Sequence, residues 1–74
     1  MNEEMLEELF GVEAFSTRGV NDGYVLKFNH SYIKIYVHEG MSYKVEHYEY
    51  GKQLPFKTDI VNINKMREYA SKFK

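Results

Sequence analysis

The sequence predicts one α+β domain, residues 1–74, built as a short helix, three or four antiparallel strands in a meander, and a second helix. Three observations predict this fold. Apolar and polar residues alternate through three successive segments between residues 24 and 50, and this period of two is typical of β-strands. Apolar residues recur at helical spacing near both ends of the chain. The length of 74 residues leaves room for a single domain.

The first helix is expected over residues 2–10. Asn2 is a favourable N-cap, because its side-chain oxygen can accept a hydrogen bond from a backbone N–H of the first turn. Gly11 follows the apolar stripe of this segment and suits the left-handed conformation that ends many helices. Beyond the helix, residues 13–18 are a candidate edge strand, and residues 21–23 have the chemistry of a turn.

The register of the two central hairpins follows from the rule that directly opposed residues share one face of a sheet. In the first hairpin, the preferred register opposes Leu26 to Ile33, because the next register would set Lys27 against Lys34. In the second hairpin, a three- or five-residue loop containing Gly40 is expected. The preferred register opposes Lys34 to Glu46, and a register with Gly40 as the third loop residue remains open.

After these hairpins the chain is expected to turn near residues 50–52 and to run extended through residues 54–56, which are a second candidate edge strand. A C-terminal helix follows, beginning at Asn62 or, as an alternative, at residues 58–59. Its apolar residues are spaced to form one stripe, so this helix is expected to close the core. The expected core face of the sheet carries Leu26, Phe28, Ile33, Ile35, Val37 and Val45.

The opposite face of the predicted sheet collects tyrosines and lysines, turned toward water. Tyrosine offers a broad contact area at a low entropic cost and is enriched in binding hot spots. An equally weighted explanation is that tyrosine is simply a good strand former. The residues expected to bind a partner on this face are Tyr32, Lys34, Tyr36, Lys44, Tyr48 and Tyr50.

Charge is distributed unevenly, although the net charge is only −1. Residues 1–15 hold five glutamates and no basic residue, whereas residues 50–74 hold six basic and two acidic residues. A solvated helix face is the favoured explanation for the glutamates, and recognition of a basic partner is the alternative. The second candidate binding surface therefore comprises Glu3, Glu4, Glu7 and Glu8.

No pattern of catalysis, cofactor binding or metal binding is present in the sequence. The chain has no cysteine, so it forms neither disulfides nor thiolate metal sites, and it has no Gly-rich phosphate loop or nucleophile elbow. His38 and His47 fall on opposite faces of the sheet, and His30 lies in a turn, so a shared zinc site is not expected. His47 lies on the core face, which indicates either that the core opens there or that this strand is misregistered.

The location expected from the sequence is the cytoplasm, away from membranes. No apolar run reaches the length of about 18–20 residues that a membrane-spanning helix needs. The N-terminal segment is acidic, which is the reverse of a secretory signal.

In size, in its lack of cysteine and tryptophan, and in its abundance of Tyr, Lys, Glu and Asn, the chain resembles small proteins of phages and mobile elements. That resemblance implies a stoichiometric inhibitor or adaptor of a host or defence protein. The expected function is therefore binding of a protein, without catalysis or cofactor, by a monomer or homodimer. The alternative is single-stranded nucleic-acid binding, with bases stacked on the tyrosines and lysines along the phosphates.

Overall fold

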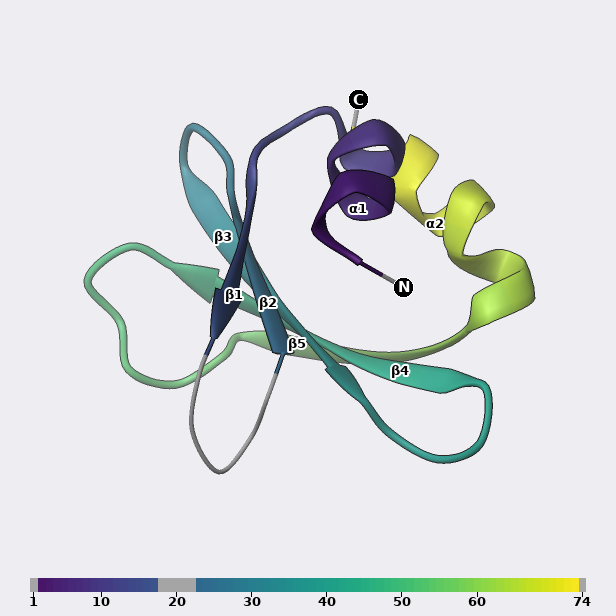
Figure 1. The fold of residues 1–74 in the computed structure, drawn as a ribbon. Helices are drawn as coiled ribbons and strands as arrows, with labels where there is room; N and C mark the ends of the chain where they lie inside the picture. The colour runs from purple at the N-terminus through teal and green to yellow at the C-terminus, as the bar shows by residue number, and fades with distance from the viewer. Residues whose placement is uncertain (1, 18–22, 74) are drawn as a thin grey trace.

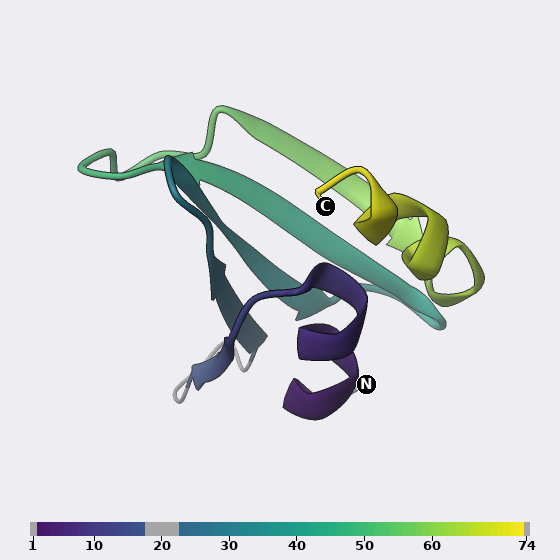
Figure 2. The same cartoon turned by 90° about the horizontal axis from the view of Figure 1, so that it is seen from above.

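The computed structural model describes residues 2–17 and 23–73, and it confirms the α+β meander, with five strands rather than three or four. The strands follow one another in the order β1-β2-β3-β4-β5, each antiparallel to the next (Figure 1). Both helices lie on one side of the sheet, which curls around them (Figure 2). The elements are α1 (Glu3–Phe10), β1 (Ala14–Thr17), β2 (Gly23–Lys27), β3 (Ser31–Val37), β4 (Ser42–Glu49), β5 (Lys57–Asn62), the 3-10 turn η1 (Ile63–Lys65) and α2 (Met66–Ser71).

The N-terminal part of the chain agrees with the sequence prediction. The Asn2 side chain accepts a hydrogen bond of 2.9 Å from the Met5 N–H, and Gly11 ends α1 with a φ of 76°. The candidate edge strand is confirmed as β1. Of the predicted turn at residues 21–23, only Gly23 is described, and it begins β2; the other two residues lie outside the described residues.

Both preferred hairpin registers are confirmed. Leu26 lies opposite Ile33 in β2 and β3, and Lys34 lies opposite Glu46 in β3 and β4. The register assigned to His47 is therefore correct, and its position on the face covered by the helices is real. We call the face covered by the helices the inner face and the other the outer face.

Two predictions for the C-terminal third were wrong. Residues 54–56 form no strand, and residues 58–59 lie within β5 rather than at a helix start. The β-branched residues of this segment let it pair along β4, and Val61 becomes buried there. The predicted start at Asn62 is confirmed, because its side chain caps η1 by accepting a 2.9 Å hydrogen bond from the Asn64 N–H.

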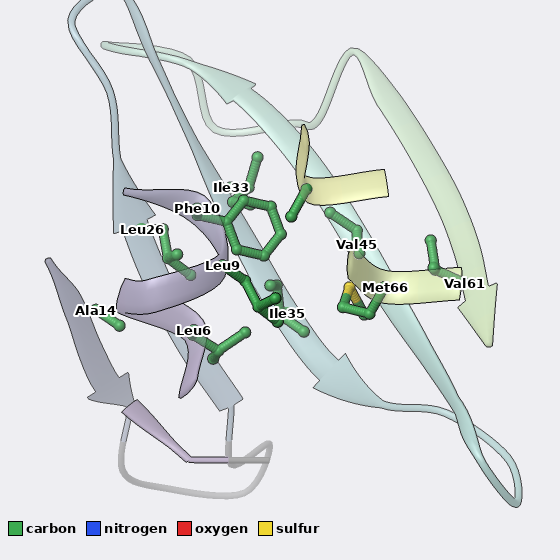
Figure 3. Packing of buried hydrophobic residues seen from close by; sticks show 11 residues of the cluster. Leu6, Leu9, Phe10, Ala14, Leu26, Ile33, Ile35, Val45, Val61 and Met66 are labelled. Atoms are coloured by element: carbon green, nitrogen blue, oxygen red, sulfur yellow. The ribbon is translucent and has the colours of Figure 1, made fainter. Parts of the chain in front are cut away.

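The hydrophobic core lies between the inner face and both helices (Figure 3). Phe10 of α1 packs edge-on against Phe73 beyond α2, with ring centroids 5.3 Å apart, so the two ends of the chain meet over the sheet. Val37 was predicted in the core but is 69% exposed, because it is the last residue of β3 and fewer neighbours cover the end of the strand. Phe28, also predicted there, is half-buried against the core. The buried cluster comprises Leu6, Leu9, Phe10, Ala14, Leu26, Ile33, Ile35, Val45, Val61, Met66 and Ala70.

Candidate functional site

The outer face carries the predicted tyrosines and lysines, because strand alternation turns them away from both helices. Tyr32 lies opposite Tyr48, and Tyr36 lies opposite Lys44, across β3 and β4. Tyr50 follows β4 directly; its ring lies 5.5 Å from that of Tyr32, and its hydroxyl donates a 2.7 Å hydrogen bond to a backbone carbonyl of residue 28. The structure thus brings together all six predicted residues of this face.

Tyr48 corrects one part of the prediction, because it is on the outer face yet only 6% exposed. The Tyr32 ring stacks on it at 4.9 Å with an interplanar angle of 4°, and the Lys34 ammonium lies 4.9 Å from its ring centre. Its hydroxyl donates a 3.2 Å hydrogen bond to Glu46. Burial, followed by the nearby Glu46 carboxylate, raises the pKa of Tyr48 to about 12. Tyr48 therefore supports the surface that its neighbours present.

Tyr36 is half-buried, and its ring packs over Gly23 on the neighbouring strand. A Cβ atom at residue 23 would lie 2.7 Å from a ring carbon of Tyr36 and 2.5 Å from the Ile35 carbonyl oxygen. Glycine at this position therefore makes room for the ring.

We expect Gly23→Ala to destabilise the domain by roughly 1–3 kcal/mol, because the added methyl group overpacks the site. The Tyr36 ring should also move, which NMR would detect as a change in its ring resonances. Chemical denaturation measures the loss of stability. The control is Thr58→Ala, at an exposed position of β5, which should change the stability by no more than about 0.5 kcal/mol. Wild-type stability with an unmoved Tyr36 ring would contradict this role of Gly23.

The outer face extends beyond the predicted residues to two exposed apolar side chains. Phe15 in β1 is 45% exposed, and the Lys27 ammonium lies 5.7 Å from its ring centre. Ile60 in β5 is 54% exposed and lies opposite Lys44. The sequence prediction omitted both, although the alternation of β1 against β2 would have placed Phe15 on this face.

The glutamates of α1 lie apart from this surface, because α1 packs on the inner face. Glu7 accepts a 3.0 Å hydrogen bond from the Ala14 N–H, and Glu3 accepts one from the Ser16 hydroxyl. These two carboxylates therefore tie α1 to β1, so the four glutamates do not form one free acidic surface. Glu4 and Glu8 are exposed.

A second group of polar side chains joins β4, β5 and α2 on the inner face. The Tyr69 hydroxyl donates a 2.7 Å hydrogen bond to the Asp59 carboxylate. His47 Nε2 lies 2.6 Å from the Tyr69 oxygen and 3.2 Å from the same carboxylate oxygen. Since the single hydroxyl proton of Tyr69 goes to Asp59, these contacts are satisfied when Nε2 carries a proton and donates it. We call these three residues the polar cluster.

The surroundings shift the pKa of each group in the polar cluster. Burial lowers the pKa of His47, and this effect outweighs the opposing hydrogen bond and charge of Asp59. Burial alone would raise the pKa of Asp59, but hydrogen bonds from Tyr69 and His47 and the Lys57 ammonium at 3.7 Å lower it overall. Burial, followed by the hydrogen bond to Asp59, raises the pKa of Tyr69.

We expect the stability of the domain to fall as the pH is lowered from about 7 to about 5, because the unfolded state takes up a proton on His47 near pH 6.5 before the folded state does. The lowered pKa of Asp59 also makes the folded state less stable as the pH falls, and it adds a further loss of stability below about pH 4. Urea denaturation at each pH measures the effect. A His47→Gln variant should lose the first part of the dependence, whereas replacement of the exposed His38 should keep it. A slope of the opposite sign would refute this account.

The polar cluster borders a pocket of about 330 Å³ between β5 and α2. Lys57 and Lys72 stand at this pocket, and Phe73 stacks on the His47 ring at 5.7 Å. Within residues 2–17 and 23–73, no three His, Cys, Asp or Glu side chains are grouped so that they could hold a metal ion. His47 was noted from the sequence as unusual, but its partners were missed because they lie 12 and 22 residues away in the chain.

Among the residues that the structure describes, no helix combines the length and the apolar character needed to cross a membrane. Comparison of the chain with protein-family models, curated proteins and solved structures finds no match in any of the three.

Proposed function

We propose that this protein acts by binding another protein through the outer face of its sheet, stoichiometrically and without catalysis. One observation carries the proposal: the outer face presents aromatic side chains that no other described element covers, since both helices pack on the inner face. Tyrosines at the centre of a surface are the residues most often found to dominate binding energy. The stacked rings are also held in place before binding, which lowers the entropic cost of association.

The charge of the outer face indicates what kind of partner fits it. Lys27, Lys34 and Lys44 lie on this face, and Glu46 is the acidic residue among them. The Glu46 carboxylate already accepts the Tyr48 hydrogen bond. The complementary partner surface is therefore apolar at its centre and acidic around it. An inhibitor or adaptor acting on a host or defence protein would use the face in this way.

Single-stranded nucleic-acid binding is the alternative, and it needs aromatic ring faces on which bases can stack. The mutual stacking of Tyr32 and Tyr48 occupies one face of each ring, and the Lys34 ammonium also lies over Tyr48. The net charge of −1 gives little general attraction to phosphates. These features favour the protein partner.

The experiment is affinity capture from lysate with mass spectrometry, comparing the wild-type protein with Tyr36→Ala and Lys44→Ala. Each substitution should weaken capture of the specific partner by about 1–2 kcal/mol while the domain stays folded. Tyr36→Phe keeps the ring, and Lys65→Ala changes an exposed lysine on the helix side, so both controls should bind normally. Equal capture by all variants would rule out the outer face.

The nucleic-acid alternative has a separate measurement. Fluorescence anisotropy of labelled single-stranded DNA and RNA at low salt should show no binding. Binding that weakens steeply with added salt would instead favour the alternative.

A further inference from the structure

The two edges of the sheet differ in whether side chains of the same chain bind to them. In an antiparallel pair, the N–H and C=O of successive residues point alternately toward and away from the neighbouring strand. The Ile63 N–H donates a 2.8 Å hydrogen bond to the Met41 carbonyl, directly after the pair Ser42 and Asn62. Because this direction alternates along the strand, the backbone N–H and C=O groups of residues 61 and 59 also point toward β4. The backbone groups of Thr58, Ile60 and Asn62 therefore point away from the sheet.

At the β1 edge, side chains of α1 already occupy one backbone donor and one side chain of the strand. The Ala14 N–H, at this edge, is bound by the Glu7 carboxylate, and the Ser16 side chain is bound by Glu3. A carboxylate bound to an edge N–H hinders the pairing of another strand at that position.

The β5 edge has no such cover among the described residues. β5 is the last strand in the sheet order and is six residues long. Thr58, Ile60 and Asn62 are all exposed, and α2 contacts the inner face, where Val61 is buried. A row of outward backbone donors and acceptors of this length is a template for an additional strand.

The pocket beside the polar cluster lies along this same edge. One wall is formed by Lys57, Asp59, Ile60 and Val61 of β5, of which Ile60 lies at the strand edge, together with His47 of β4. The other wall is formed by Tyr69, Lys72 and Phe73. The side chains of an added strand would alternate between this pocket and the outer face beside Ile60. The negative charge of Asp59 is already matched by the Lys57 ammonium and by hydrogen bonds, whereas Lys72 adds a further positive charge at the pocket. An acidic side chain therefore fits the pocket, and an apolar one fits beside Ile60.

From these observations we infer that β5 accepts an extended segment of a partner protein as a sixth strand, with an acidic side chain in the pocket between Lys57 and Lys72. The site is separate from the outer face of the proposed function, since it uses the strand edge and the inner side of β5. The recognised segment alternates apolar and acidic residues, and its main chain pairs with the outward groups of Thr58 and Ile60.

The probe is a short synthetic peptide in which valine and glutamate alternate, titrated into the full protein and followed by NMR and amide hydrogen exchange. Binding should shift the resonances of residues 57–62 and of the pocket, and slow exchange at the Thr58 and Ile60 amides. The same peptide with lysine in place of glutamate is the charge control.

Three variants test the backbone pairing and the charge preference independently. Ile60→Pro removes an N–H that points away from β4, so the sheet keeps its own hydrogen bonds while peptide binding should weaken by about tenfold or more. Ile60→Thr keeps the N–H and should bind. Lys72→Glu leaves the backbone unchanged and should reverse the preference from the glutamate peptide to the lysine peptide.

Specific outcomes would overturn the inference. Equal binding of both peptides to the wild-type protein, or an unchanged preference in Lys72→Glu, would exclude the acidic segment. Self-association that Ile60→Pro abolishes, with no peptide binding, would identify a second copy of this chain as the occupant instead. Tyr36→Ala should leave peptide binding unchanged, which separates this test from that of the outer face.

Discussion

Phe10→Ala is expected to leave most of the protein unfolded at room temperature. Phe10 is 1% exposed, and its ring sits at the centre of the core, where it meets Phe73. Removal of a buried phenylalanine ring costs about 3–5 kcal/mol, from lost apolar burial and the cavity left behind. A domain of this size rarely has more than about 3–5 kcal/mol of stability in total. Loss of the circular dichroism signal, or urea denaturation where some folded protein remains, measures the effect.

The chain offers a matched control for this substitution. Phe15→Ala removes the same ring from the outer face, where it is 45% exposed, so the loss should be no more than about 1 kcal/mol. Phe10→Leu fills part of the cavity, so its stability should lie between those of Phe10→Ala and Phe15→Ala. Comparable stability of Phe10→Ala and Phe15→Ala would show that the core is not centred where the structure places it.

Asp59→Ala is expected to destabilise the protein by about 1–3 kcal/mol, because a hydrogen-bond acceptor shared by the buried His47 and the half-buried Tyr69 is lost. Its carboxylate accepts the Tyr69 hydroxyl at 2.7 Å and lies 3.2 Å from His47 Nε2. Without it, the hydrogen bond that remains to the Tyr69 hydroxyl and His47 Nε2 within the described residues is the one between them. Urea denaturation near neutral pH measures the loss.

Asp59→Asn is the control, because the amide oxygen can still accept the Tyr69 hydrogen bond while the charge is removed. Asp59→Asn should therefore lose less stability than Asp59→Ala. If the alanine variant were as stable as the wild type, the polar cluster would make no net contribution, and α2 would be held by apolar packing alone.

Periodicity and charge in the sequence were sufficient to predict the central sheet. The opposition of Leu26 to Ile33 and of Lys34 to Glu46 was deduced from face sharing and from the avoidance of like-charge pairs, and the structure has both. These deductions succeed because the pairs belong to hairpins of adjacent strands, where few registers compete.

The prediction was less successful where a feature depends on distant parts of the chain. β5 was missed because its alternation is short and Pro55 drew the strand assignment to the preceding residues. The burial of Tyr48 follows from its neighbours on β3. The polar cluster joins three elements, and no local pattern connects Asp59 or Tyr69 to His47.

The nearest-neighbour order of the five strands also has a consequence for how the chain folds. Each strand after the first pairs with the one before it, so the sheet can form one hairpin at a time without closing a long loop. Topologies with such local contacts fold quickly. The contact of Phe10 with Phe73 is the exception, since it joins the first helix to the segment after the last one across a sequence separation of 63 (73 − 10). Because this contact links the two ends of the chain, we expect removal of the last few residues to loosen α1 at the opposite end.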